Sequence, residues 1–228
     1  RLDSQLLLAD MLDQDRSWLL AHTDTVITEE TRQKLDAQLE ERAKHVPLAY
    51  IRGKTEFYGR EFYVDKRVLE PRPESETMID ILRPLPGANN GKMETIDVGT
   101  GSGALAVTAK LELPQATVIA TDIDPGCLEV AEKNAAKHND SIEFTQGDML
   151  EPMGTVPPGL SVITIANLPY VPDEYTVNQA AMQEPRIAIF GGPDGLDPYR
   201  KLFEQAASFS ERPRYILTES LPPQHKQL

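Results

Sequence analysis

The tetrapeptide Asn167-Leu168-Pro169-Tyr170 contains the groups needed to hold a planar amide or amino group for chemistry at its nitrogen. Such a nitrogen is a weak nucleophile because its lone pair is delocalised, so both of its hydrogens must be held while the lone pair is aimed. The Asn167 side-chain oxygen and the Leu168 carbonyl oxygen can each accept one N–H. Pro169 restricts the residue before it to extended conformations, which helps to fix that carbonyl, and Tyr170 can stack on the planar group.

These roles make Asn167, Pro169 and Tyr170 the candidate catalytic residues, with Leu168 as a further substrate-binding residue. The predicted reaction is an in-line displacement in which the held nitrogen is the nucleophile. It requires no strong general base beforehand, because the extra proton becomes acidic only as the new bond forms. Positioning is the main contribution expected, on the order of 7–11 kcal/mol for a well-oriented reaction. An isolated Asn-x-Pro-Tyr sequence is more typical of a turn with a buried tyrosine. The surrounding sequence therefore decides between a structural turn and a catalytic segment.

That context includes a glycine-rich loop, from Asp97 to Ala104, between a predicted strand and a predicted helix. Glycines let a backbone turn sharply and approach a ligand closely, and a helix start offers unpaired N–H groups. Gly99, Gly101 and Ala104 satisfy the dinucleotide pattern. The further glycine at position 103 gives the Gly-x-Gly-x-Gly form that is common in methyltransferases.

Two carboxylates bear on the choice between a nicotinamide cofactor and S-adenosyl-L-methionine. Asp122 ends the next predicted strand, where it can accept both ribose hydroxyls of either molecule. Asp97 can approach the ammonium group of a methionine moiety, whereas a pyrophosphate would gain nothing from its charge. S-adenosyl-L-methionine is therefore favoured. Its expected contacts in this region are Asp97, Gly99, Thr100, Gly101, Ser102, Gly103 and Asp122.

Asp148 and Met149 follow the third predicted strand of the same region. Asp148 can accept a hydrogen bond from an adenine amino group, and Met149 can pack on the ring. Both residue types also suit a helix cap and a core position, so both interpretations stay open.

The motifs lie where predicted strands and helices alternate along the chain. The predicted strands are residues 94–98, 117–122, 142–145, 160–166 and 214–218, and the predicted helices are residues 103–113, 125–138 and 198–209. Alternation of this kind predicts an α/β, Rossmann-like class I methyltransferase fold with a mostly parallel, doubly wound sheet. Ligands of such sheets bind at the carboxyl ends of the strands, where the motifs are found.

The residues before this region predict a different organisation. Apolar residues at helical spacing continue to Val46, with Thr28 as an expected N-cap and Pro47 closing the segment. Residues 56–64 place aromatic and β-branched residues on both sides of a glycine, which predicts a β-hairpin. A helix at 74–82 and a loop at 84–92 complete the prediction.

The composition narrows the function classes. The net charge is −13 without any Lys/Arg-rich run, so nucleic acid is not expected as the direct substrate. Cys127 is the only cysteine and the four histidines lack metal-ligand spacing, so neither a disulfide nor a metal is expected. No stretch approaches the roughly 20 apolar residues of a membrane span, which favours a cytoplasmic protein. The chain begins inside an amphipathic segment and stops soon after a strand, so trimming is expected, particularly at the C-terminus.

At this point the chain resembles the HemK/PrmC protein-glutamine methyltransferases, which modify the Gly-Gly-Gln glutamine of peptide chain release factors. The resemblance rests on residues 47–53, 56–59, 68–76, 184–186 and 191–200, and on Glu219 and Gln224. The segment Pro73-Glu74-Ser75-Glu76 favours the release-factor branch over a sister family that methylates a ribosomal protein. The resemblance implies a helical substrate-recognition domain at 1–50, a hairpin linker at 51–73 and an S-adenosyl-L-methionine-dependent domain at 74–228. It also implies cofactor contacts at Met149 and Asn167, and we expect Arg72 and Glu76 to contact the substrate.

Three positions depart from the family pattern. Leu168 replaces the first proline of Asn-Pro-Pro-Tyr, which removes some rigidity. Glu70 stands where an apolar residue is common, and a buried carboxylate there would be costly. Residues 220–223 replace the usual sequence before Gln224, and the family's closing strand pair is absent.

Three rival functions remain. Asn-Leu-Pro-Tyr is also the form found in ribosomal RNA adenine dimethyltransferases, so methylation of adenine N6 in RNA or DNA is one alternative. A non-catalytic module that binds S-adenosyl-L-methionine is a second, supported only by the Leu168 departure. A nicotinamide dehydrogenase explains the glycines and Asp122 but leaves Asn167 to Tyr170 unexplained.

Overall fold

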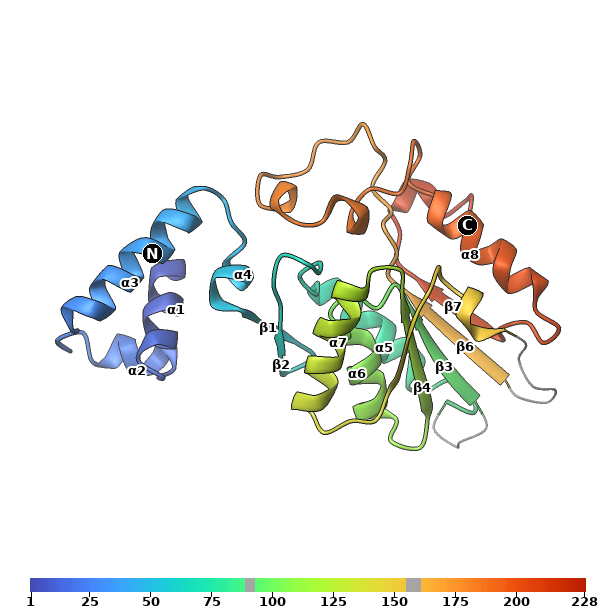
Figure 1. Ribbon diagram of the computed structural model, residues 1–228, viewed down its shortest axis with the longest axis horizontal. Coiled ribbons are helices and arrows are strands. Elements are labelled where there is room, and N and C mark those ends of the chain that lie inside the picture. The colour runs from blue at the N-terminus through green and yellow to red at the C-terminus, as the bar shows by residue number, and fades with distance from the viewer. Residues whose placement is uncertain (89–92, 155–160) are drawn as a thin grey trace.

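The computed structural model describes residues 1–88, 93–154 and 161–228. Residues 89–92 of the predicted loop and Leu160 of the predicted fourth strand lie outside these ranges. The chain begins with a small lobe of three helices, α1 (Leu2–Met11), α2 (Arg16–Ala21) and α3 (Glu29–Ala43), which lies at one end of the molecule (Figure 1). The predicted N-cap is confirmed, because Thr28 Oγ1 accepts a hydrogen bond from Thr31 N at 3.1 Å.

The helical part of the chain continues past the position expected for its end. A short helix, α4 (Leu48–Arg52), begins directly after Pro47. Proline suits the start of a helix, where its missing N–H would have no partner in any case, so Pro47 separates two helices. Arg52 on α4 forms a salt bridge of 2.6 Å with Asp10 on α1, which fixes α4 to the lobe.

A two-stranded hairpin follows, formed by β1 (Lys54–Phe57) and β2 (Arg60–Tyr63), as the sequence predicts. Its two turn residues, Tyr58 and Gly59, have φ angles of +53° and +69°. Positive φ at both positions is typical of the type I′ turn, whose twist matches that of a hairpin. Phe57 and Phe62 are buried, with ring centroids 6.1 Å apart in an edge-to-face arrangement, so the hairpin packs against the α/β domain.

The second part of the chain forms the predicted parallel sheet. Its strands are β3 (Met93–Val98), β4 (Thr117–Asp122), β5 (Glu143–Gln146), β6 (Ser161–Ala166) and β7 (Tyr215–Thr218), in the order β5-β4-β3-β6-β7. Each neighbouring pair is parallel. The chain order reverses beside β3, and ligands of such sheets bind at this switch point, outside the carboxyl ends of the strands.

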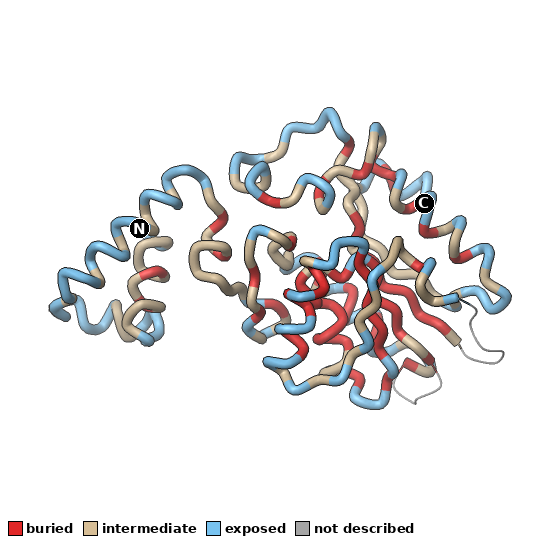
Figure 2. Tube along the Cα trace, viewed as in Figure 1, coloured by how far each residue is buried: buried red, intermediate tan, exposed pale blue. Residues whose placement is uncertain are grey.

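Helices cover both faces of the sheet. The helices α5 (Glu76–Leu82), α6 (Ala104–Glu112) and α7 (Pro125–Lys137) lie on one side, and α8 (Asp197–Ser208) lies on the other (Figure 1). Side chains along β6 alternate between the two layers: Ile163 and Ile165 join the core under α5 and α6, whereas Val162 joins the core under α8. The central strands are accordingly buried (Figure 2). This arrangement confirms the doubly wound α/β prediction.

Candidate active site

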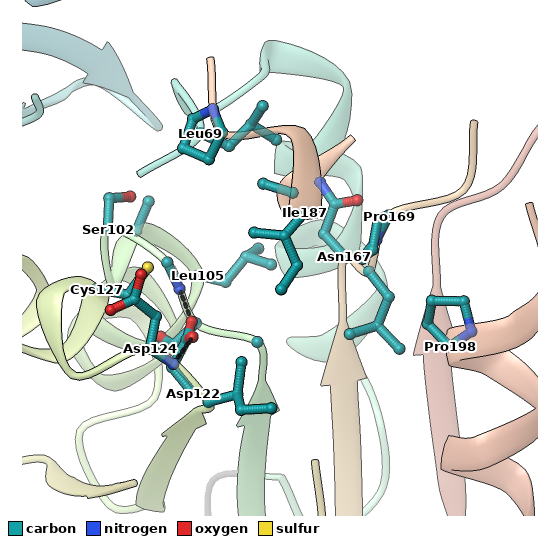
Figure 3. Close-up of a pocket in the computed structure, with 18 of the residues that line it drawn as sticks. Leu69, Ser102, Leu105, Asp122, Asp124, Cys127, Asn167, Pro169, Ile187 and Pro198 are labelled. Carbon is teal, nitrogen blue, oxygen red and sulfur yellow. Dashed lines mark hydrogen bonds between the residues drawn. The ribbon is translucent and has the colours of Figure 1, made fainter. Parts of the chain in front are cut away.

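A pocket of about 430 Å³ opens at the carboxyl ends of the central strands. The turns after β3, β4, β5 and β6 supply much of its lining, and further lining residues come from the segments 69–75 and 185–188 and from the start of α8. Figure 3 shows Asp122 and Asp124 on one side of this pocket and Asn167 and Pro169 on the other. Two of the predicted motifs therefore face a shared cavity.

The glycine-rich loop borders this pocket with Gly99, Thr100, Gly101 and Ser102. Gly99 has a φ of +68°, and a Cβ atom there would lie 3.1 Å from Leu168 Cδ2. The segment Asn167 to Tyr170, called the acceptor turn below, therefore packs directly on the loop. Gly103 does not line the pocket. Its φ is +78° and a Cβ atom would lie 2.9 Å from Ala131 Cβ, so this glycine allows α6 to pack closely on α7.

Asp122 holds the glycine loop and the next turn in place. Its Oδ2 accepts a hydrogen bond from Gly101 N at 2.9 Å, and its Oδ1 accepts one from Asp124 N at 3.0 Å. Burial is the main reason why the pKa of this carboxyl group is raised. The residue lines the pocket, and each carboxylate oxygen has a further lone pair with which to accept a ligand hydroxyl.

Asp97 lies behind the loop and does not line the pocket. Its Oδ2 accepts hydrogen bonds from Thr100 Oγ1 at 2.6 Å and from Ala106 N at 3.1 Å. Its Oδ1 is buried without a hydrogen-bond partner among the described residues, and burial raises the pKa of the carboxyl group to about 7. An unpaired buried carboxylate oxygen is costly, so a cationic ligand group near the loop would be stabilised here. This fits the ammonium group of a methionine moiety.

Asp148 and Met149 both line the pocket. The Asp148 carboxylate forms an ion pair with Lys201 on α8. Met149 has an unusual φ of +57°, and its carbonyl oxygen accepts a hydrogen bond from Thr121 Oγ1 at 2.8 Å. A non-glycine residue at positive φ persists only where its surroundings hold it, so the position of the methionine is set by the neighbouring strand.

Asn167, Leu168 and Pro169 all line the pocket, with Asn167 and Pro169 across from Asp122, and Leu168 is buried. Asn167 Nδ2 donates a hydrogen bond to Ser75 Oγ at 2.7 Å. None of the described residues donates to Asn167 Oδ1. The amide oxygen is thus available as an acceptor, as the sequence predicts.

The Leu168 carbonyl is held although the first proline of the family pattern is missing. Tyr199 Oη lies 3.1 Å from Leu168 O, and the Tyr199 ring is fully buried. One lone pair of the carbonyl oxygen remains for a substrate N–H.

Tyr170, Arg72 and Glu76 lie in different surroundings. Tyr170 lines a neighbouring cavity of about 580 Å³, and Arg72 lines both cavities. The Arg72 guanidinium pairs with Glu184, whose side chain is 1% exposed. Glu76 lines neither of these cavities, and its carboxylate accepts a hydrogen bond from Tyr58 N at 2.7 Å. The structure therefore brings Arg72 to the pocket and Tyr170 to its neighbour, while Glu76 supports the hairpin.

Glu70 avoids the cost that the sequence suggests for a buried carboxylate. Its side chain is 27% exposed and lies 3.8 Å from the Arg72 guanidinium. Thr55 Oγ1 donates a further hydrogen bond to Glu70 Oε1 at 3.3 Å. The departure from the family pattern is accommodated because this position lies on the wall of both cavities.

Several lining residues were not among the sequence candidates. Ile123 follows Asp122 directly, so its place at the strand end was a usable signal. Ser75 belongs to a segment that the resemblance singled out, but nothing local shows that it meets Asn167. Ile187 and Lys201 approach from later parts of the chain, and their spacing gives no indication of this contact.

Across residues 1–88, 93–154 and 161–228, no helix has the length and apolar character needed to cross a membrane. Within the same ranges, no cluster of three histidine, cysteine, aspartate or glutamate side chains is arranged to hold a metal ion.

Comparison with known proteins adds independent evidence. Residues 1–53 match the PrmC N-terminal domain, and residues 89–181 match a methyltransferase domain. The chain is 36% identical to the release factor glutamine methyltransferase of Koribacter versatilis over 209 residues. This alignment covers 90% of this chain and 73% of that protein. The chain is 38% identical over 207 residues to the protein of the same name from Bacillus subtilis, which covers 88% and 72%.

Solved structures support the fold. The delta-N METTL16 MTase domain superposes with a TM-score of 0.53 at 20% identity, over 73% of this chain and 76% of that one. The ribosomal protein L11 methylase of Lactobacillus delbrueckii subsp. bulgaricus gives a TM-score of 0.50 at 19% identity, over 72% and 69%. With its methyltransferase domain and its relatives named as methyltransferases, the chain uses S-adenosyl-L-methionine as its cofactor. By its 36% and 38% identity to the enzymes of Koribacter versatilis and Bacillus subtilis over most of its length, the chain belongs to the release factor glutamine methyltransferase family.

Proposed function

We propose that this protein transfers a methyl group from S-adenosyl-L-methionine to the side-chain amide nitrogen of the glutamine in the Gly-Gly-Gln motif of a peptide chain release factor. The observation that carries the proposal is that Asn167 and Asp122 line one pocket from opposite sides. An oxygen suited to hold an amide hydrogen thus faces the loop suited to hold the cofactor. The release-factor names of the relatives support the choice of substrate.

One group of pocket residues is assigned to S-adenosyl-L-methionine and another to the substrate glutamine. When bound, S-adenosyl-L-methionine supplies an electrophilic methyl group on a positively charged sulfur. Gly99 and Gly101 would let the backbone approach the cofactor, and Asp122 would accept hydrogen bonds from its ribose hydroxyls. Met149 and Asp148 would hold the adenine, and the buried Asp97 would stabilise the ammonium group from behind the loop.

The acceptor turn positions the substrate amide. Asn167 Oδ1 accepts one amide hydrogen and Leu168 O accepts the other, which turns the nitrogen towards the methyl group. The bound cofactor would supply the methyl carbon, with its sulfur leaving as a neutral thioether as the carbon–nitrogen bond forms, and the nitrogen would release its extra proton to water. Pro169 and the packing of Leu168 on Gly99 keep the turn in place. Because these groups are fixed before the reaction, positioning accounts for much of the rate enhancement.

The remainder of the chain serves recognition of the protein substrate. We assign residues 1–50 to a helical substrate-recognition domain, 51–73 to a hairpin linker and 74–228 to the catalytic domain. Arg72 and Tyr170 line the neighbouring cavity, which extends from the pocket to Arg42 and Leu48 beside the helical lobe. This cavity would receive the segment around the glutamine. A release factor acts in translation, so the reaction belongs to the cytoplasm, and the acidic chain is not suited to nucleic acid as its direct substrate.

The test is incubation with methyl-labelled S-adenosyl-L-methionine and either purified release factor or ribosomal RNA. We expect label on the release factor, at the Gly-Gly-Gln glutamine, as located by peptide mass spectrometry. A release factor with that glutamine replaced by alanine is the matched control. Label on RNA and none on protein would refute the substrate assignment. Cofactor binding without label on either macromolecule would favour a non-catalytic module.

A further inference from the structure

We propose that Glu219 is a positioning residue that sets the direction of the Asn167 side-chain amide through the hydroxyl group of Ser75. This inference rests on the proposed function, because the direction matters only if Asn167 Oδ1 receives a substrate hydrogen. Its basis is a chain of hydrogen bonds that joins three separate parts of the sequence.

The three contacts form a continuous path. Asn167 Nδ2, after β6, donates to Ser75 Oγ at 2.7 Å. Ser75 Oγ, next to α5, donates to Glu219 Oε2 at 2.7 Å, and Glu219 directly follows β7. Tyr170 Oη donates to the other carboxylate oxygen, Glu219 Oε1, at 2.9 Å. The Glu219 carboxylate therefore accepts one hydrogen bond from Tyr170 and one from Ser75, which in turn accepts a hydrogen bond from Asn167.

Shape alone does not fix an asparagine amide, because its oxygen and its NH₂ group are nearly the same size. Their arrangement follows from the hydrogen-bond partners. An ionised carboxylate can only accept hydrogen bonds, so the single hydrogen of the Ser75 hydroxyl points at Glu219. The lone pairs of Ser75 Oγ then face Asn167, and only the NH₂ group of the amide can pair with them. The oxygen is left on the opposite side, free to accept a substrate hydrogen.

Burial makes this path effective. Ser75 is 3% exposed, so water is poorly placed to reverse its hydroxyl group. Tyr170 is a reliable donor to the second carboxylate oxygen, because burial and the adjacent Glu219 raise the pKa of its phenol. With both oxygens engaged, the Glu219 carboxylate is fixed in rotation as well as in position.

The conservative change Glu219→Gln tests the direction of the hydrogen bonds from Asn167 through Ser75 to Glu219. A glutamine amide has a single acceptor oxygen, so it cannot accept from Ser75 and Tyr170 on separate oxygens. If its NH₂ group faces Ser75, the serine hydroxyl turns towards Asn167 and the asparagine oxygen turns away from the substrate. If its NH₂ group faces Tyr170, that tyrosine loses its acceptor.

The experiment compares Ser75→Ala, Ser75→Thr and Glu219→Gln in the full chain, with purified release factor and labelled S-adenosyl-L-methionine. Thr77→Ala removes an exposed hydroxyl two residues from Ser75, and Glu211→Gln removes an exposed carboxylate, so these are the matched controls. We expect kcat to fall about 10- to 100-fold in Ser75→Ala and Glu219→Gln, as the loss of a hydrogen bond to a charged group would give. The dissociation constant for S-adenosyl-L-methionine, measured by calorimetry, should stay within about twofold in all variants. Ser75→Thr keeps the hydroxyl group, so its kcat should be close to that of the wild type and well above that of Ser75→Ala.

A second readout does not depend on the release factor. The side-chain NH₂ signals of Asn167 in an amide NMR spectrum, identified by their loss in Asn167→Ala, should shift in Ser75→Ala and Glu219→Gln but not in Thr77→Ala. Unchanged signals, wild-type kcat in Ser75→Ala, or an inactive but folded Ser75→Thr would each overturn the proposal. If the wild-type chain fails to methylate the release factor, the proposed function fails, while the NMR comparison still decides the positioning role.

Discussion

The hydroxyl group of Tyr199 connects the ends of two neighbouring strands. Its oxygen lies 3.1 Å from the carbonyl oxygen of Leu168, after β6, and also contacts the carbonyl oxygen of Glu219, after β7. The single hydroxyl hydrogen can serve either carbonyl. A fully buried tyrosine from α8 thus supports the acceptor turn at the position where the family pattern has a proline.

Tyr199→Phe removes this connection without changing the ring. We expect the free energy of unfolding to fall by about 1–3 kcal/mol, because buried carbonyl groups lose a hydrogen bond. The kcat should fall with little change in cofactor affinity, since Leu168 is less firmly held. Urea unfolding and steady-state kinetics measure the two effects. Tyr215→Phe on β7 is the matched control, and equal effects of both changes would argue against a special role for Tyr199.

Asn167→Ala tests the acceptor site itself. The variant should bind S-adenosyl-L-methionine nearly as well as the wild type, because Asp122 and the glycine loop are untouched. Turnover should fall at least about 100-fold, because a hydrogen bond that orients the reacting amide is lost. Calorimetry and the labelled-methyl assay provide the comparison. Unchanged turnover would show that the assumed amide geometry is incorrect.

Glu184 is expected to hold two walls of the pocket together. Its buried carboxylate pairs with Arg72 and accepts a hydrogen bond from Glu70 N at 3.1 Å. Glu184→Ala would leave the Arg72 guanidinium without this partner, and breaking a buried pair costs about 3–5 kcal/mol. The half-exposed Arg72 reduces this, so we expect the lower end of that range in urea unfolding.

The same change should affect the protein substrate more than the cofactor. Arg72 lines both cavities and the adjoining residues Pro185 and Ile187 line the pocket, so KM for the release factor should rise more than the dissociation constant for S-adenosyl-L-methionine. Glu174→Ala, an exposed position in the same loop, is the control. A larger loss of cofactor affinity than of release-factor affinity would contradict this role.

Asp122 and Asp148 should differ in their importance for the cofactor. Asp122→Asn replaces one of two acceptor oxygens that hold Gly101 and Asp124, so the dissociation constant should rise about 10-fold or more, corresponding to a loss of at least ~1.4 kcal/mol. Asp148→Asn should have a smaller effect, because that carboxylate is already paired with Lys201. Calorimetry on both variants decides the order, and a reversed order would show that Asp148 contributes more than Asp122 to cofactor binding.

Asp97 should make stability depend on pH. Its pKa in the folded chain is raised to about 7 from the ordinary 3.8, chiefly by burial, so the folded state holds this proton more tightly than the unfolded chain does. The resulting stabilisation is fully present below about pH 4 and is lost as the pH rises through 7. Over that range its size is on the order of 4 kcal/mol.

Asp97→Asn should remove this pH dependence. The measurement is the free energy of unfolding at pH 5 and pH 8 without added cofactor, with Asp24→Asn as an exposed control. From pH 5 to pH 8 the free energy of unfolding of the wild type should fall relative to that of Asp97→Asn. A constant difference at both pH values would show that Asp97 does not titrate in this window.

The sequence by itself determined the sheet and the location of the candidate site. Strands and helices alternate at local spacing, and the motifs at Gly99, Asp122 and Asn167 each follow directly on a strand. In a parallel sheet the residues that directly follow the strands lie at the same edge, independently of the conformation of the connecting loops. Local patterns also gave the hairpin at β1 and β2 and the N-cap at Thr28, since a turn or cap depends on a few adjacent residues.

Only the tertiary structure decided which groups complete that site. Ser75 meets Asn167 across 92 positions, Arg72 meets Glu184 across 112, and Ser75 meets Glu219 across 144. Lys201 reaches Asp148 from the last helix, while Glu76, a candidate from the resemblance, supports the hairpin instead. The spacing of residues reports the repeat of a helix or a strand, but a contact between distant segments depends on how the layers pack. For this reason the strand ends could be predicted, whereas the network that orients Asn167 could not.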